Sequence, residues 1–320
     1  MLIFENCNEL ELYKQKCLPK KFESVLTIGN FDGVHLGHKS LIQKVNDKAK
    51  LLGVYSGAIT FDPHPLHYFL GSNALALINS RKLKLEYLSR LGLDFVLVLK
   101  FDQAFATLEP EEFVKKYLCQ LCAVKHLIIG YDYSFGKNRR GNFSLLETLG
   151  FECGFSIEKI EAFSLNQTII SSTRIRECLE QGNLSEIKTI MGRFYAVDGE
   201  VIHGFKRGAS LLGFPTANLK HQGLLLPQVG VYACLVEYNG KLFQAVANLG
   251  NNPSFDNKEL SLEVHILDFA EELYGKTLRV HFVSYLRGEK KFSNLEALVT
   301  QIKNDIEQAR PILKKALVEF

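Results

Sequence analysis

The stretch GNFDGVHLGH (residues 29–38) decides the fold of the first half of this chain. It follows VLTIG (residues 25–29), a short apolar run that is typical of a buried strand. After it, residues 38–52 carry apolar side chains at the helical period: Leu41, Ile42, Val45, Ala49 and Leu52. The stretch is therefore predicted to be a strand-to-helix turn, with His35 and His38 beside the N-terminus of the helix.

The alternation of apolar runs and amphipathic segments continues to about residue 170. Further strands are predicted at residues 57–61, 94–101 and 126–130, and further helices at residues 81–91 and 110–121. Strands that alternate with helices form a parallel, doubly wound sheet. The first half is therefore predicted to be an α/β domain.

The pattern changes after about residue 192. Short alternating runs follow one another at residues 200–204, 231–238, 242–250, 261–269 and 278–286. Asn239 and Gly240 form the Asn-Gly pair that tight hairpins favour. This texture predicts an antiparallel barrel or sandwich, and we favour the barrel. A C-terminal helix is expected at residues 292–317, broken or kinked at Pro311. We place the boundary at residues 182–192, which gives domains 1–185 and 186–320.

Composition limits the classes of function. The net charge is +3 over 320 residues, so we expect neither nucleic acid nor a membrane as a partner, but small molecules. The longest apolar runs are strand-sized, and the N-terminus lacks the pattern of a signal peptide. The seven cysteines are most simply reduced thiols, which predicts a cytoplasmic protein. The sequence leaves the oligomeric state open.

The histidine pair allows more than one interpretation. A helix N-terminus presents free backbone N–H groups and the positive end of the helix dipole, so His35 and His38 could bind phosphate oxygens there. The same pair could simply cap the helix or lie on the surface. A zinc site is disfavoured because no third ligand lies nearby at a suitable spacing. A Walker A loop is excluded by the spacing of the glycines.

A resemblance to a known family makes the predicted function of the first domain specific. GNFDGVHLGH resembles the GxFDxxHxGH motif of the nucleotidyltransferase superfamily. Three more blocks follow in the expected order: TFDPHP (60–65), IIGYDYSFGKNRRGN (128–142) and ISSTRIR (170–176). Together they are similar to the FMN adenylyltransferase module of bacterial bifunctional riboflavin kinase/FAD synthetases. The resemblance implies a Rossmann-like nucleotidyltransferase fold, in which the FMN phosphate attacks the α-phosphorus of ATP and expels pyrophosphate.

The resemblance also implies roles for residues of this domain. The ATP-binding residues would be Asn30, Asp32, His35, His38, Ser172, Thr173 and Arg176, with the two histidines also catalytic. The flavin-binding residues would be Phe61, Pro63, His64, Asp132 and Tyr133. Because the FMN phosphate is already a nucleophile, alignment and charge neutralisation would suffice for the reaction. From the residues alone, Asp132 could equally form a turn.

The second domain contains its own phosphate-type loop, HGFKRGASLLGFPTANL (residues 203–219). Its glycines would let the backbone approach a phosphate closely. The Thr216 hydroxyl and the Asn218 amide oxygen are hard donors of the kind that Mg²⁺ accepts. As an isolated string, however, PTAN is more often a turn than a metal site.

GFPTAN is the most characteristic motif of riboflavin kinases, and the later blocks of residues 230–309 resemble that family as well. The resemblance implies that Glu263 is the general base when the riboflavin 5′-hydroxyl attacks the γ-phosphorus of ATP. It places ATP on Gly204, Lys206, Arg207, Gly208, Thr216 and Asn218, and Mg²⁺ on Thr216 and Asn218. Arg287 would contact the flavin, unless it is a surface arginine. For Glu263, strand alternation alone predicts only an outward-facing polar residue.

The predicted function is therefore a bifunctional enzyme that converts riboflavin to FMN and FMN to FAD, with ATP and Mg²⁺ in both steps. The alternatives are a flavin- or nucleotide-sensing binding module and an enzyme with only one active half.

Overall fold

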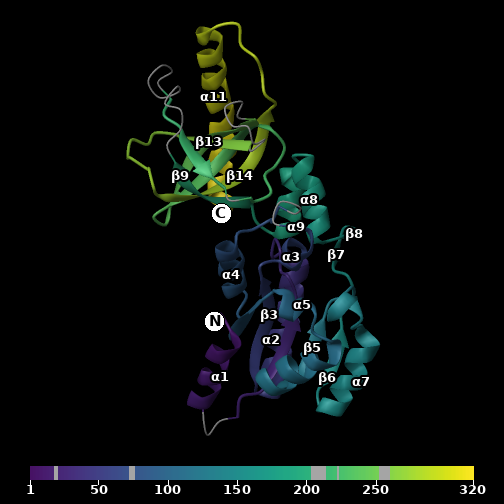
Figure 1. The fold of residues 1–320 in the computed structure, drawn as a ribbon. Helices are drawn as coiled ribbons and strands as arrows, with labels where there is room; N and C mark the ends of the chain where they lie inside the picture. The colour runs from purple at the N-terminus through teal and green to yellow at the C-terminus, as the bar shows by residue number, and fades with distance from the viewer. Residues whose placement is uncertain (18–20, 72–75, 203–213, 222, 252–259) are drawn as a thin grey trace. The chain divides into compact units, whose positions relative to one another are not determined.

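The computed structural model describes residues 1–17, 21–71, 76–202, 214–221, 223–251 and 260–320. The chain divides into two compact units (Figure 1). The first contains Met1–Ala76 and Arg81–Ser171, and the second contains Leu77–Ser80 and Ser172–Phe320. In the part of the chain that is described, no helix is long and apolar enough to cross a membrane.

The first unit contains a six-stranded parallel sheet in the order β1-β4-β3-β2-β5-β6, which confirms the predicted α/β fold. The strands are β1 (Leu2–Phe4), β2 (Ser24–Ile28), β3 (Tyr55–Asp62), β4 (Phe95–Lys100), β5 (Val124–Ile129) and β6 (Ser156–Lys159). A short hairpin, β7 (Ser164–Leu165) and β8 (Thr168–Ile169), lies outside this sheet.

The order of the strands locates the place where a ligand can bind. Along the chain, β3 and β4 are added on one side of β2, and β5 and β6 on the other. In open α/β sheets, ligands bind outside the carboxyl ends of the strands where this order reverses. The loop after β2 ends at His35, which directly precedes α2 and its residue His38, and the loop after β5 contains Asp132 and Tyr133. The topology therefore brings two predicted site segments to the same edge.

The helices of the first unit follow the predicted periodicity with shifted ends. They are α1 (Cys7–Lys16), α2 (Leu36–Leu52), α3 (Pro65–Leu70), α4 (Arg81–Ser89), α5 (Gln103–Ala106), α6 (Pro110–Phe113), the π-helical η1 (Val114–Leu121), the 3₁₀ turn η2 (Lys137–Arg139) and α7 (Phe143–Cys153). Leu41, Ile42, Val45 and Ala49 of α2 are buried as expected. Leu52 is 46% exposed, because Gly53 ends the helix in the left-handed conformation just after it.

The second unit contains a closed antiparallel barrel in the order β10-β13-β12-β11-β14-β9, which confirms the predicted barrel. Its strands are β9 (Tyr195–Ile202), β10 (Ala217–Lys220), β11 (Gly230–Tyr238), β12 (Lys241–Asn251), β13 (Leu260–Ile266) and β14 (Thr277–Arg287). Helices α8 (Ser172–Glu180) and α9 (Leu184–Met191) precede the barrel. Asn239 and Gly240 join β11 to β12 at φ values of 50° and 72°, as a tight type I′ turn requires.

The C-terminal helix corrects one expectation. Helix α11 (Figure 1) runs from Leu295 to Glu319 with Pro311 inside it, so of the two predicted effects of Pro311, a break or a kink, the break was wrong. A proline inside a helix loses one backbone hydrogen bond and costs about 3 kcal/mol. The buried side chains on both sides of it outweigh this cost, since Ala309, Leu313 and Ala316 pack against apolar residues of β11 and β12.

A buried histidine of the barrel gives the first prediction, which concerns stability and pH. His281 lies beside Glu237, Arg279 and the ring of Phe320, and burial lowers its pKa to about 4. The unfolded chain binds this proton near pH 6.5, so the stability contributed by neutral His281 is present above pH 6.5 and is lost as the pH falls toward 4. We expect the free energy of unfolding to decrease by up to about 3 kcal/mol over this interval. His281→Gln, which does not titrate, should flatten the profile in urea denaturation; equal slopes for both proteins would contradict the prediction.

Candidate active sites

The histidine pair forms a reciprocal cap on α2. His35 is the N-cap residue, and its Nδ1 accepts the backbone N–H of His38 at 3.3 Å. The backbone N–H of His35 donates in turn to Nδ1 of His38, also at 3.3 Å. The two rings stack with centroids 3.7 Å apart. Because both Nδ1 atoms accept, each neutral ring carries its proton on Nε2, where it is a donor. The capping interpretation is thus confirmed, and it is compatible with binding of phosphate.

The loop around the pair has an unusual backbone. Phe31 and Val34 adopt positive φ values of 50° and 38°, which are rare for residues other than glycine and especially for a β-branched side chain. A Cβ at Gly37 would lie 3.1 Å from Nδ1 and Cε1 of His35, so glycine leaves room for this ring. The edge of Phe31 meets His38 at a centroid distance of 5.1 Å. Strain of this kind concentrates at functional sites, where the surrounding structure maintains it.

Asn30 and Asp32 lie in the same loop. Asp32 is buried, and the backbone carbonyl of Asn30 accepts hydrogen bonds from the Thr60 hydroxyl and from Nζ of Lys84. Lys84 is not among the site residues predicted from the sequence. A signal was present, because Lys84 precedes the buried Tyr87 and Leu88 by three and four residues, which places it on the inner side of α4.

The proposed flavin residues follow β3. Phe61 packs edge-on against Phe101 and tilted against Phe105, with ring centroids 5.7 and 5.4 Å away. The peptide bond between Asp62 and Pro63 is cis. His64 is buried and caps α3, since its Nδ1 accepts the backbone N–H of Leu66 at 3.1 Å. These residues give the segment an ordered, largely aromatic surface.

The two predicted flavin residues after β5 differ in how deeply they are buried. Asp132 is exposed, whereas the ring of Tyr133 stacks on Phe135 with centroids 5.7 Å apart. The Tyr133 hydroxyl is buried, and no described residue is its hydrogen-bond partner. Burial accordingly raises the pKa of Tyr133. A buried hydroxyl without a partner is uncommon in native proteins and is available to a ligand or to water.

Ser172, Thr173 and Arg176 open α8 and belong to the second compact unit. Their role at the phosphates held by the histidine pair therefore stays a prediction.

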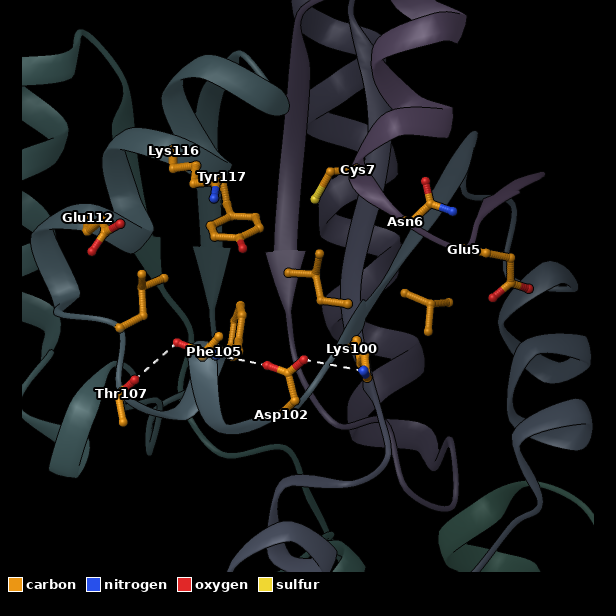
Figure 2. Close-up of a pocket in the computed structure, with 14 residues that line it drawn as sticks. Glu5, Asn6, Cys7, Lys100, Asp102, Phe105, Thr107, Glu112, Lys116 and Tyr117 are labelled. Atoms are coloured by element: carbon orange, nitrogen blue, oxygen red, sulfur yellow. Dashed lines mark hydrogen bonds and ion pairs between the residues drawn. The ribbon is translucent and has the colours of Figure 1, made fainter.

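A cavity of about 600 Å³ lies elsewhere in the first unit, between the start of α1, the end of β4 and the segments that follow β4 (Figure 2). None of the predicted site residues lines it. Its charged groups are partly engaged with one another, as Asp102 lies 3.5 Å from Nζ of Lys100 and accepts the backbone N–H of Phe105. One lining residue, Phe105, packs against Phe61 of the predicted flavin segment at a centroid distance of 5.4 Å.

The barrel places Glu263 between two asparagines. On β13, Glu263 lies directly opposite Asn218 of β10 and Asn248 of β12. Opposite residues of antiparallel strands project to the same face, with Cβ atoms roughly 5 Å apart. Leu262 and Val264 project to the other face and are buried. The structure thus confirms that Glu263 faces outward, and it adds that the neighbouring residues are polar.

The environment of Glu263 suits a proton acceptor or a cation. The carboxyl group is half-buried, and this burial raises its pKa. Within the described residues, no ion pair offsets the charge of Glu263. The PTAN segment is attached to the same strand, because the Pro215 carbonyl accepts a hydrogen bond from Nδ1 of His265 at 2.8 Å. The hydroxyl of Thr216 and the amide oxygen of Asn218 therefore belong to the same short region as the Glu263 carboxylate, and these two neutral oxygens are donors of the kind that Mg²⁺ accepts.

Four predicted ATP residues of the barrel, namely Gly204, Lys206, Arg207 and Gly208, lie outside the described residues.

Arg287 is not a free surface arginine. Its Nε and Nη2 donate to the carboxylate of Asp305 on α11 at 2.7–3.1 Å, and its Nη1 donates to the Gly288 carbonyl. Asp305 is 2% exposed and also accepts from Gln301. Arg287 pairs with Val231, which pairs with Asn248, so it shares one transverse row of the barrel with Glu263. Asp305 is not among the residues predicted from the sequence, because a single acidic residue on a helix carries no distinguishing signal.

Two family models match this chain. The model of FAD synthetases matches residues 18–174, and the model of riboflavin kinases matches residues 191–313. Together with a parallel α/β unit and a closed barrel, these matches define a two-domain transferase that acts on phosphate groups.

Similar proteins extend over nearly the whole chain. The bifunctional riboflavin kinase/FMN adenylyltransferase of Haemophilus influenzae is 39% identical over 286 residues, which are 89% of this chain and 92% of that protein. The protein of the same description from Listeria monocytogenes is 36% identical over 302 residues, 91% of this chain and 93% of that protein. A crystal structure described as a macrolide-efflux protein from Streptococcus pneumoniae has a TM-score of 0.84 and 29% identity, and the match covers 97% of this chain and 99% of that one.

The chain therefore belongs to the family of bifunctional riboflavin kinases/FMN adenylyltransferases. It is an enzyme with both activities, the adenylyltransferase in the N-terminal part and the kinase in the C-terminal part.

Proposed function

We propose that residues 1–185 adenylylate FMN and residues 186–320 phosphorylate riboflavin, each with its own ATP and Mg²⁺. The observation that carries this proposal is the presence of two separate polar sites. One is the histidine pair that caps α2, and the other is Glu263 of the barrel with Asn218 and Asn248 opposite it. The product of the second domain would be the acceptor in the first. Both reactions consume ATP, so we expect them to take place in the cytoplasm.

In the first domain, the FMN phosphate attacks the α-phosphorus of ATP, and pyrophosphate leaves. The Nε2–H groups of His35 and His38 donate to phosphate oxygens at the N-terminus of α2, where the helix dipole also favours negative charge. Asn30 and Asp32 also bind ATP at this site. The β- and γ-phosphates of ATP are bound by Ser172, Thr173 and Arg176. On the acceptor side, the flavin-binding residues are Phe61, Pro63, His64, Asp132 and Tyr133. The protein mainly aligns the reactants and stabilises charge.

In the second domain, Glu263 accepts the proton of the riboflavin 5′-hydroxyl as the hydroxyl oxygen attacks the γ-phosphorus of ATP, and ADP leaves. The raised pKa of Glu263 supports this role, because a base works best when its pKa approaches the working pH. Thr216 and Asn218 hold Mg²⁺, which would neutralise charge on the phosphates. Arg287, oriented by Asp305, contacts the flavin, while Gly204, Lys206, Arg207 and Gly208 bind ATP.

Incubation of the full chain with riboflavin, ATP and Mg²⁺ should give FMN first and FAD later, as followed by liquid chromatography. Chelation with EDTA should lower both rates at least ~100-fold, because the divalent cation is expected to supply several kcal/mol of transition-state stabilisation, and excess Mg²⁺ should restore them. Unchanged FMN formation in EDTA would contradict the metal assignment at Thr216 and Asn218. Absence of any phosphorylated flavin would contradict the proposal as a whole.

A further inference from the structure

Lys84 connects the two loops that are proposed to hold the two substrates of adenylyl transfer. Its Nζ lies 3.4 Å from the Asn30 carbonyl, 3.2 Å from the Thr60 hydroxyl and 3.2 Å from the Phe61 carbonyl. An ammonium group has three donors, and here three oxygens accept them. The Thr60 hydroxyl also donates to the Asn30 carbonyl at 3.3 Å, so the four groups form one small network.

The network lies at the carboxyl edge of the sheet. Asn30 follows the end of β2 by two residues and opens the loop with the histidine pair. Phe61 is the penultimate residue of β3 and the second residue of the TFDPHP segment on the acceptor side. Strands β2 and β3 are neighbours in parallel register. Lys84 approaches this edge from α4 and therefore fixes the spacing between the two loops.

Lys84 lies among charges of both signs. Burial lowers the pKa of Lys84 and the neighbouring cation of Arg81 adds to this shift, whereas the carboxylates of Asp62 and Asp32 oppose it. One helical turn earlier, Arg81 pairs with Asp62 at 3.0 Å, so the side of α4 that faces the sheet edge carries two cations. A lysine without a role in this network would more simply extend into solvent, as the exposed Lys82 does.

We infer that Lys84 is a positioning residue for adenylyl transfer. It holds the loop between β2 and α2, which leads to the histidine pair, at a fixed distance from the TFDPHP segment. This distance aligns the FMN phosphate with the α-phosphorus of ATP. The inference rests on the proposed function of the first domain. Lys84 touches backbone and a hydroxyl group of the loops, so it acts through them. Because a displacement of about 1 Å can lower a rate about 10²-fold, the loss of this network should reduce turnover much more than binding.

The test compares three variants of the full chain. Lys84→Met keeps the length and the apolar stem but removes the charge and the donors, Lys84→Arg keeps charge and donors, and Lys82→Met is the matched control on the exposed side of the same helix. FAD formation from FMN and ATP is measured at steady state, and FMN formation from riboflavin is measured in the same samples. The second activity reports on the integrity of the chain independently of the first site.

Lys84→Met should lower kcat for FAD formation by about 10- to 100-fold, with KM for ATP and for FMN changed less than about threefold. Lys84→Arg should recover most of the lost kcat, and Lys82→Met should match the unaltered protein in both activities. Wild-type kcat in Lys84→Met would overturn the inference. It would also be overturned if Lys84→Met lost activity only in proportion to a lower melting temperature and Lys84→Arg did not recover it. Absence of FAD from the unaltered protein, with FMN still formed, would instead contradict the proposed function.

Discussion

Glu263→Gln should lower kcat for riboflavin phosphorylation by about 10²- to 10⁴-fold, while riboflavin still binds. Glutamine has nearly the same shape as glutamate and fits the same position opposite Asn218 and Asn248, but it cannot accept the proton of the 5′-hydroxyl. Steady-state formation of FMN and quenching of riboflavin fluorescence measure the two effects separately.

The pH profile of the unaltered enzyme tests the same assignment. Burial raises the pKa of Glu263, and the base must be ionised to act. The kinase rate should therefore fall as the pH decreases through a value above the ordinary pKa of about 4.3 for glutamate. Glu200→Gln, at an exposed position on β9, is the matched control and should leave the rate unchanged. A rate for Glu263→Gln within about twofold of the unaltered protein would rule out Glu263 as the base.

His38→Ala should stop FAD formation while FMN accumulates. The variant loses an Nε2–H donor proposed to act on phosphate, and removal of one such donor typically lowers kcat by about 10²- to 10³-fold. It also loses half of the reciprocal cap on α2, since the backbone N–H of His35 donates to Nδ1 of His38. Chromatographic separation of FMN and FAD during turnover of riboflavin measures the result.

A second substitution separates capping from catalysis. Asparagine is a strong N-cap residue, so His35→Asn should keep the stability of α2 and still lose FAD formation to a similar extent. His35→Ala should lose both, with a decrease of about 1 kcal/mol in the free energy of unfolding. Gln43→Ala, exposed on the same helix, is the control. If the chain had only one active half, His38→Ala would leave every flavin product unaltered.

The periodicity of the sequence determined the two folds. Alternating apolar runs and amphipathic segments predicted the parallel sheet. Closely spaced runs with the Asn-Gly turn predicted an antiparallel barrel or sandwich, and the structure is a closed barrel. Such patterns are reliable because burial of one face is required at every repeat. The histidine pair could also be placed from the sequence, since the strand before it and the helix after it are both strongly patterned.

Other features depended on contacts between distant segments. Pro311 reads locally as a helix breaker, but packing of α11 on β11 and β12 carries the helix through it. Glu263 is one polar residue among several on the barrel strands, and the register places it between Asn218 and Asn248.

Lys84 and Asp305 show the same limit most clearly. A lysine and an aspartate on amphipathic helices resemble ordinary solvated residues. Lys84 donates hydrogen bonds to carbonyls 54 and 23 positions away in the chain, and Asp305 accepts hydrogen bonds from an arginine 18 positions away. The sequence by itself determined the folds, the family resemblance and the residue types of the candidate sites. The tertiary structure alone decided which groups hold those residues in place, because hydrogen bonds between distant segments leave no periodic pattern along the chain.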